Sequence, residues 1–301
     1  MAKYAVLWLL VHGVGRLPAR LLYAATALAG TLAWHLSRRI RATTRDHARH
    51  VLGIAASRRA VDATARACAR STSAYYADLA RYARMTPEAV IAQVESFEGW
   101  EHLTEASDRG DGVVLVSAHL GCPEVMAQAA AAFNLHIGVV TEPLHPPRVH
   151  RLMDRVRGRH GVRLFAADLG GLREARTHLK HGGALGLVVD RDVLGSGRPY
   201  PFFGEPTRMP TGAVELALRT GAPMVAVWVL RGSRPERMRI RVEPVPLPAA
   251  SGDRQADLDS GMAALLRCME RAIAGAPGQW FALSPIWGGL ASDGHPAAPL
   301  H

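Results

Sequence analysis

Short apolar runs of strand length alternate with segments of helical pattern from residue 112 to residue 242. The runs that read as strands are 112–118, 137–140, 162–165, 184–189, 223–230 and 238–242. The segments between them that read as helices are 125–133, 147–160, 172–181 and 212–220. Because the runs 137–140, 184–189 and 223–230 are apolar throughout, both faces of their sheet must be covered. The sequence therefore predicts an α/β fold with a mostly parallel central sheet flanked by helices.

The rest of the chain adds helices before and after this region. Residues 57–83 and 260–274 read as helices, and 94–97 read as a short strand. Thr86 and Pro87 are typical of the N-cap and first position of a further helix. The predicted organisation is an N-terminal anchor over 1–50, one α/β domain over 51–290 and a flexible tail over 291–301.

Two apolar stretches, 4–14 and 21–36, lie near the N-terminus, with Arg16, Pro18 and Arg20 between them. Beyond them lies a basic cluster, at Arg38, Arg39, Arg41, Arg45 and Arg49. Neither stretch reaches the roughly 18 to 20 residues that span a bilayer core, and a basic cluster in this position is not typical of a cleaved signal peptide. The pattern favours helices that lie in the membrane interface, with apolar faces among acyl chains and guanidinium groups at lipid phosphates. The alternative is a pair of core helices next to a solvated basic segment.

The formal net charge of +10 predicts an anionic partner, such as a membrane surface or a phosphorylated substrate. No basic stretch is interleaved with aromatic residues, which disfavours a nucleic-acid partner. The three cysteines, Cys68, Cys122 and Cys268, form no C-x-x-C pair. They predict neither a disulfide framework nor a zinc site, and they favour a reducing cytoplasmic setting.

The segment 117–124, Ser-Ala-His-Leu-Gly-Cys-Pro-Glu, lies between a predicted buried strand and a predicted helix. Ligands bind at the carboxyl ends of strands in open α/β sheets, which is where this segment places His119. Glu124 lies five positions later, close enough to reach back to one imidazole nitrogen. The other nitrogen is then available to take a proton from a hydroxyl group. The spacing alone is weak support for a catalytic pair.

The same segment resembles the H-x4-D/E motif of the lysophospholipid and lipid A acyltransferase superfamily. Further blocks of the chain are similar to that group in the same order: 189–192 (Val-Asp-Arg-Asp), 201–205 (Pro-Phe-Phe-Gly-Glu), 209–210 (Met-Pro), 216–223 (Leu-Ala-Leu-Arg-Thr-Gly-Ala-Pro) and 279–287. Among its branches the combination is most similar to the actinobacterial phosphatidylinositol mannoside acyltransferases. The resemblance runs from about residue 1 to 290 and implies a glycerol-3-phosphate-acyltransferase-like fold.

The resemblance assigns roles to individual residues. It makes His119 the general base and Glu124 its orienting carboxylate. Asp190 matches an acidic position that fixes the histidine or a sugar hydroxyl, where the mannoside branch carries glutamate. Arg157 matches an arginine that grips a phosphate. Arg191, Asp192, Phe203 and Gly204 complete the expected substrate-binding set. The turn with Phe203 and Gly204 is either a wall of the acyl tunnel or ordinary core, because aromatic residues are typical of both settings.

The implied reaction is direct transfer of an acyl group from acyl-CoA or acyl carrier protein to a hydroxyl of a glycolipid such as a phosphatidylinositol mannoside. Backbone amides near Gly121 are expected to stabilise the oxyanion. No metal or cofactor is required, and the absence of a G-x-S-x-G segment disfavours a serine hydrolase. The expected location is the cytoplasmic face of the bacterial inner membrane, peripheral or monotopic.

Other interpretations of the sequence stay open. The acceptor is alternatively a lipid A precursor or a lysophospholipid. Asp190 and Asp192 also form a D-x-D pattern, as in metal-dependent glycosyltransferases. Cys122 beside His119 is an alternative thiol nucleophile. A basic membrane-binding protein without activity is the non-enzymatic alternative.

Overall fold

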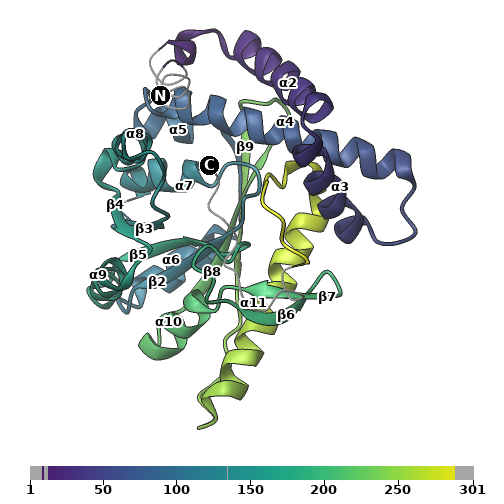
Figure 1. Cartoon of the computed structure of the whole chain (residues 1–301). Coiled ribbons are helices and arrows are strands. Elements are labelled where there is room, and N and C mark those ends of the chain that lie inside the picture. The colour runs from purple at the N-terminus through teal and green to yellow at the C-terminus, as the bar shows by residue number, and fades with distance from the viewer. Residues whose placement is uncertain (1–8, 10–12, 134, 289–301) are drawn as a thin grey trace.

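The computed structural model describes residues 9, 13–133 and 135–288 (Figure 1). Its centre is a seven-stranded sheet with the strand order β1-β9-β8-β2-β5-β3-β4. The strands are β1 (Val94–Glu98), β2 (Val113–Ser117), β3 (Ile137–Thr141), β4 (Arg163–Ala166), β5 (Ala184–Val188), β8 (Met224–Arg231) and β9 (Met238–Pro244). Every neighbouring pair is parallel except β8 and β9, which are antiparallel. The predicted mostly parallel sheet is therefore confirmed.

Helices cover both faces of the sheet. They are α4 (Arg58–Tyr82), α5 (Pro87–Ile91), α6 (Trp100–Asp108), α7 (Glu124–Ala129), α8 (Pro147–Arg157), α9 (Leu169–Lys180), α10 (Gly212–Thr220) and α11 (Arg254–Gly275). Val114 and Val116 of β2 pack in one core with α9, α10 and α11. Val113 and Leu115, which alternate with them, pack in a second core with α5, α6 and α7. Burial on both faces explains why β2 carries apolar residues on both of its faces.

Three features of the fold were not predicted from the sequence. One is the helix α6, and another is the antiparallel pairing of β8 and β9. The third is a separate hairpin of β6 (Arg198–Phe202) and β7 (Glu205–Met209). The hairpin strands are largely exposed and contain three prolines, Pro199, Pro201 and Pro206. A proline-rich exposed strand lacks both the apolar run and the period-two pattern that mark a strand in sequence.

The N-terminal region forms two helices, α2 (Ala19–Leu36) and α3 (Arg38–Leu52), that lie beside α4 at one end of the molecule (Figure 1). A side chain at Gly30 of α2 would meet the backbone of α4 at 2.7 Å, at Ala69 and Arg70, so the two helices cross at close range. None of the helices in the described part of the chain has the length and hydropathy needed to cross a bilayer.

Parts of the predicted organisation lie outside the described residues. They are most of the first apolar stretch, residues 4–8 and 10–12, and the expected tail over 291–301. Short 3₁₀ turns complete the described chain: η1 (Val14–Arg16), η2 (Ala130–Phe133), η3 (Arg159–Gly161) and η4 (Pro277–Gln279).

Candidate functional site

His119 and Asp190 are brought together by the register of two neighbouring strands. Ser117 and Val188 are Cα partners at the carboxyl ends of the parallel strands β2 and β5. His119 and Asp190 each lie two residues beyond, so both side chains are at the same edge of the sheet. The Nδ1 atom of His119 lies 2.7 Å from Oδ1 of Asp190, and the backbone N–H of His119 donates to Oδ2 at 3.1 Å. One carboxylate therefore binds both the ring and the backbone of the histidine.

The Asp190 carboxylate is fully buried and has a third donor. The indole Nε1 of Trp280 donates to Oδ2 at 2.8 Å. Burial alone would raise the pKa of Asp190, but His119 and the Trp280 hydrogen bond outweigh it and lower the pKa to about 2. The carboxylate is consequently ionised at neutral pH, and it accepts hydrogen bonds without donating any.

An ionised Asp190 fixes the state of the histidine. Because the carboxylate only accepts, Nδ1 of neutral His119 must carry the proton, and Nε2 keeps its lone pair. Nε2 has no hydrogen-bond partner among the described residues, and the His119 side chain keeps 26% of its exposure. The ring of Phe281 contacts the imidazole edge-to-face, with ring centroids 5.5 Å apart. The arrangement leaves an oriented imidazole with one nitrogen open to a substrate.

Glu124 does not bind His119, contrary to the expectation from the H-x4-E spacing. Its Oε1 accepts a hydrogen bond from the hydroxyl of Tyr75 at 2.5 Å and one from Nε of Arg157 at 3.1 Å. Arg157 also donates from Nη2 to the Tyr75 oxygen at 3.0 Å. Burial and the charge of Glu124 both raise the pKa of Tyr75, which is therefore a neutral phenol. The carboxylate that binds Nδ1 of His119 is that of Asp190, which follows the neighbouring strand β5.

The Tyr75–Glu124–Arg157 cluster nevertheless lies close to the histidine. The ring of Tyr75 stacks on Phe281 with centroids 4.7 Å apart, and Phe281 is the same ring that contacts His119. Phe281 thus separates two polar groups, the His119–Asp190 pair and this cluster. The three members come from α4, α7 and α8, so their proximity depends on how the helices pack and not on sequence spacing.

The backbone amides of the turn after His119 are already used. The N–H of Gly121 donates to the carbonyl of Gln279 at 3.0 Å, and that of Cys122 donates to the carbonyl of Val229 at 2.8 Å. The amide of Leu120 donates back to Ala118. The expectation that amides near Gly121 stabilise an oxyanion is therefore not supported by this geometry. These amides fix the shape of the turn instead.

Arg191 and Asp192 bind partners different from that of Asp190. Arg191 donates to Glu142 at 3.0 Å and to the hydroxyl of Ser284 at 3.2 Å. The carboxylate of Asp192 accepts from the backbone of Gly197 at 2.9 Å and closes the loop before β6. The carboxylates of Asp190 and Asp192 bind different partners. They therefore do not form the paired arrangement that the D-x-D pattern suggested. No group of three metal-ligating side chains occurs within the described residues.

Phe203 and Gly204 form the turn of the β6–β7 hairpin, and both have positive φ angles, of 50° and 80°. The N–H of Phe203 donates to Glu270 of α11 at 2.5 Å. Its ring packs against Trp280 and Trp287. The turn therefore contacts the site indirectly, because Phe203 packs on Trp280 and Trp280 binds Asp190.

Cys122 is buried and unsuited to act as a nucleophile. Burial raises the pKa of its thiol well above the ordinary value, and the nearby charge of Asp78 raises it further. The thiol is therefore protonated at neutral pH, whereas nucleophilic attack requires the thiolate.

Sequence reasoning missed Tyr75, Trp280 and Phe281 as members of the site. Tyr75 lies on a helix where an aromatic residue is typical of core packing. Trp280 and Phe281 come after the last helix, about 90 residues beyond Asp190 in the chain. The position of Trp280 and Phe281 within the 279–287 block of family resemblance was the available signal, and it gave no indication of what they contact.

Comparison with known proteins identifies a family and several relatives that this chain resembles. The family model for the bacterial lipid A biosynthesis acyltransferases matches residues 1–288. A phosphatidylinositol mannoside acyltransferase of Mycolicibacterium smegmatis is 30% identical over 191 residues, covering 62% of this chain and 60% of that protein. One from Mycobacterium tuberculosis is 28% identical over 218 residues, covering 71% of this chain and 66% of that protein.

A second phosphatidylinositol mannoside acyltransferase, from another strain of Mycobacterium tuberculosis, is 29% identical over 193 residues, or 63% of this chain and 58% of that protein. The chain therefore matches between 58% and 66% of the length of these relatives. The family match, in contrast, extends over almost all of the chain, and it confirms the resemblance expected from the motif blocks. The chain belongs to the bacterial lipid A biosynthesis acyltransferase family.

Proposed function

We propose that this chain transfers a fatty acyl group from a thioester donor to a hydroxyl group of a glycolipid, with His119 as the general base. One observation carries the proposal: the buried Asp190 carboxylate binds Nδ1 of His119 at 2.7 Å and leaves Nε2 open to a substrate. A histidine held in this way is suited to take a proton from a hydroxyl, because the carboxylate stabilises the imidazolium that forms.

The reaction proceeds in one transfer step without an acyl-enzyme. Nε2 of His119 takes the proton of the acceptor hydroxyl while its oxygen attacks the thioester carbonyl. The tetrahedral intermediate collapses, the C–S bond breaks, and the departing thiolate takes the proton from the imidazolium. An ester and a free thiol result, and His119 returns to its neutral state. Asp190 stays ionised throughout, in keeping with its lowered pKa.

The Tyr75–Glu124–Arg157 cluster is proposed to bind substrate beside the base. Within it, Arg157 is the cation suited to bind a phosphate, and its side chain keeps 24% of its exposure. Glu124 holds that guanidinium and the Tyr75 hydroxyl in place. This role differs from the orienting role that the sequence spacing suggested for Glu124, and it predicts an effect on substrate binding.

The acceptor is proposed to be a phosphatidylinositol mannoside, on the basis of the names of the three relatives. The donor is proposed to be acyl-CoA, with acyl carrier protein as the alternative. Leu21, Leu28, Leu32 and Leu36 of α2 are exposed. Their spacing places them on one face of the helix, opposite the face that packs on α4. We propose that this face contacts the inner membrane on its cytoplasmic side, where the donor is found.

The test traces radiolabelled palmitoyl-CoA into lipid in the presence of a total lipid extract. Wild type should place label in a glycolipid, and His119→Ala should reduce the initial rate by at least 100-fold. His181→Ala is the matched control, because His181 is exposed on the turn after α9 and, among the described residues, bonds only within its own helix turn. It should retain the wild-type rate.

The position of the label decides among acceptors. Label in a phosphatidylinositol mannoside supports the proposed acceptor, whereas label in a lipid A precursor or a lysophospholipid replaces it. Equal transfer by wild type and by folded His119→Ala would contradict the role of His119 as the base. Lack of transfer by wild type from both palmitoyl-CoA and palmitoyl carrier protein would contradict the acyltransferase activity itself.

A further inference from the structure

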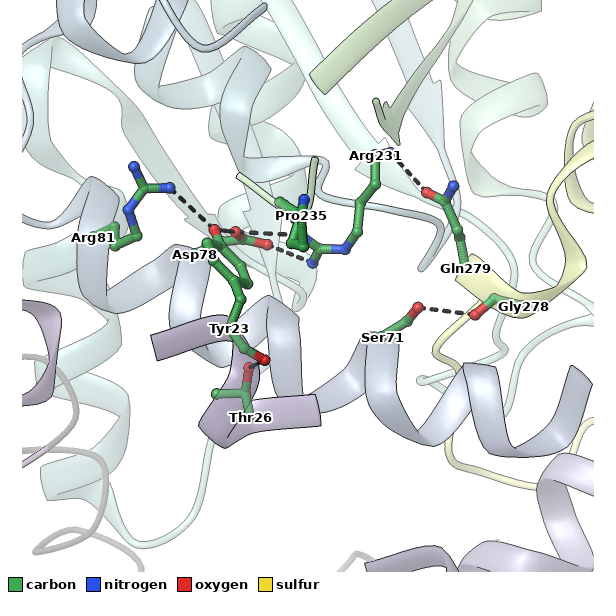
Figure 2. A network of polar contacts seen from close by, with 9 residues as sticks. All are labelled: Tyr23, Thr26, Ser71, Asp78, Arg81, Arg231, Pro235, Gly278 and Gln279. Carbon is green, nitrogen blue, oxygen red and sulfur yellow. Dashed lines mark hydrogen bonds and ion pairs between the residues drawn. The ribbon is translucent and has the colours of Figure 1, made fainter. Parts of the chain in front are cut away.

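A buried cluster of polar and charged residues is centred on Asp78 and Arg231 (Figure 2). Asp78 of α4 is 0% exposed, and its carboxylate accepts from Nη2 of Arg231 at 2.6 Å. The hydroxyl of Tyr23 on α2 also donates to Asp78, and Arg81 donates to the Tyr23 oxygen at 3.1 Å. A buried ion pair of this kind contributes little net stability compared with apolar side chains of the same shape. Stability is therefore a weak explanation for its presence.

Arg231 connects this cluster to the backbone that shapes the site. It is the last residue of β8, and its N–H donates to the side-chain oxygen of Gln279 at 2.7 Å. The carbonyl of Gln279 in turn accepts the N–H of Gly121 at 3.0 Å. Two residues further, Phe281 donates its N–H to the carbonyl of His119 at 2.7 Å. The backbone N–H of Arg231 thus holds the segment that binds both ends of the His119 turn, and the guanidinium of Arg231 is itself held by Asp78.

The turn has little room to move relative to β8. The N–H of Cys122 donates to Val229 of β8, and a side chain at Gly121 would meet the Val229 carbonyl at 1.9 Å. Gly121 has a φ of 64°, which a residue with a side chain rarely adopts. On the other side, the hydroxyl of Ser71 on α4 donates to the carbonyl of Gly278 at 2.8 Å (Figure 2). A displacement at the end of β8 would therefore also move the His119 turn.

We propose that Asp78 and Arg231 are positioning residues for acyl transfer, which hold the His119 turn through Gln279, and that Tyr23 extends this support to α2. The inference rests on the proposed function of His119 as the base. Asp78 and Arg231 do not touch the reacting atoms. They set the position of the imidazole, and a misplacement of a fraction of an ångström is enough to slow proton transfer. The helix proposed to lie on the membrane is thereby part of the support of the catalytic turn.

A double-mutant cycle separates positioning from stability. Asp78→Leu and Arg231→Met each leave a buried charge without its partner, so both single variants are expected to unfold more easily than wild type. The double variant Asp78→Leu/Arg231→Met removes both charges and should recover most of the lost stability. Its kcat should nonetheless stay at least tenfold below wild type, with the KM for palmitoyl-CoA changed less than twofold.

A matched control comes from another ion pair of α4. Arg45 on α3 binds Asp62 on α4 at 2.6 Å and has no contact with Gln279 or with the His119 turn. Asp62→Asn should therefore leave kcat at the wild-type value. Recovery of wild-type kcat together with stability in the Asp78→Leu/Arg231→Met variant would overturn the proposal, because the pair would then be only structural.

Tyr23→Phe provides a milder variant in case the double variant does not fold. It removes one donor to Asp78 and the acceptor of Arg81 but keeps the Asp78–Arg231 ion pair, and it should lower kcat about two- to fivefold at constant KM. A kcat equal to that of wild type in folded Tyr23→Phe would overturn the part of the proposal that concerns α2. If the double variant does not fold, a wild-type kcat in folded Tyr23→Phe would overturn the whole proposal.

A readout that needs no activity keeps this inference distinguishable from the proposed function. The Nδ1 proton of His119 is observed by NMR on protein with ¹⁵N-labelled histidine and assigned with His119→Ala. Its resonance should shift in Tyr23→Phe and in Asp78→Leu/Arg231→Met, and it should be unchanged in Asp62→Asn. An unchanged resonance in folded Tyr23→Phe and folded double variant would contradict the positioning role, whatever the enzyme transfers.

Discussion

His47 of α3 is buried against Trp280, the residue that binds the Asp190 carboxylate. Its ring stacks on the indole of Trp280 with centroids 4.8 Å apart, and Trp280 donates to Asp190. Burial lowers the pKa of His47 to about 4, although the charge of Asp190 opposes that change. At neutral pH the ring is therefore uncharged, and it acts as a flat packing surface for Trp280.

This burial makes the stability of the fold sensitive to acid. Because unfolded His47 takes up its proton near pH 6.5, its contribution to stability is complete above that pH. The contribution is lost as the pH falls from 6.5 toward 4, where the folded state also becomes protonated. The difference between the two pKa values corresponds to about 3 kcal/mol. Wild type should therefore lose more stability between pH 7.5 and pH 4.5 than a variant without this histidine.

His47→Phe is the variant for this measurement, since a phenyl ring keeps the stacking on Trp280 and does not titrate. The free energy of unfolding of both proteins is obtained by urea denaturation at pH 7.5 and pH 4.5. The loss on acidification should be smaller in His47→Phe by roughly 2 to 3 kcal/mol. Equal losses in the two proteins would mean that His47 is protonated in the folded state without cost.

At the scale of single elements, α2 has two faces of different character. Leu22, Tyr23 and Trp34 of this helix are buried in contacts with α3 and α4, whereas Leu28 is 61% exposed and Leu36 is 81% exposed. The basic cluster of the neighbouring helix α3 is divided in a similar way. Arg41 donates to the last carbonyls of α2 and Arg45 pairs with Asp62. The remaining members, Arg38, Arg39 and Arg49, are exposed and available to lipid phosphates.

Introducing negative charge on the exposed leucine face of α2 tests its contact with a membrane. Leu28→Glu/Leu32→Glu should lower binding to vesicles that contain phosphatidylinositol by at least tenfold in a sedimentation assay, because two carboxylates then face anionic lipid. Leu169→Glu on α9 is the control, since Leu169 is also exposed but lies outside α2. It should bind like wild type. Undiminished binding by the folded α2 variant would remove this face from the membrane contact.

Element boundaries could be predicted from the sequence where the local pattern is strong. The helix 212–220 and the N-cap at Thr86 appear in the structure as predicted, because capping and periodicity are local properties. The β6–β7 hairpin and α6 were missed, since neither carries a long apolar pattern. The direction of β9 also escaped prediction. A strand's direction depends on its partner, and the connection from β8 to β9 gives no clear hairpin signal.

At the scale of the whole molecule, the site is assembled from distant parts of the chain. His119 and Asp190 come from neighbouring strands of the sheet, Tyr75 from α4 and Arg157 from α8, while Trp280 lies beyond the last helix. The sequence identified His119 from its place after a buried strand, which topology confirms. It paired His119 with the wrong carboxylate, because nearness in sequence is a poor guide once β5 lies beside β2. The resemblance had offered Asp190 as a group that fixes either the histidine or a sugar hydroxyl, and the strand order explains why it lies at the histidine.

The pairing of His119 with Asp190 is the central claim, and steady-state kinetics of Asp190→Asn and Glu124→Gln test it most directly. An asparagine keeps the shape of Asp190 but neither carries charge nor enforces the proton on Nδ1. Asp190→Asn should therefore lower kcat by roughly 10² to 10⁴ with little change in KM. Glu124→Gln should mainly raise KM, because it weakens the hold on Arg157 and Tyr75.

Both variants are assayed with palmitoyl-CoA and the acceptor identified by labelling, after circular dichroism has verified that they are folded. We expect a loss of kcat for Asp190→Asn and a rise of KM for Glu124→Gln. A near wild-type kcat in Asp190→Asn, together with a loss of kcat in Glu124→Gln, would contradict the pairing. That result would return the orienting role to Glu124 and require a different geometry in the substrate complex.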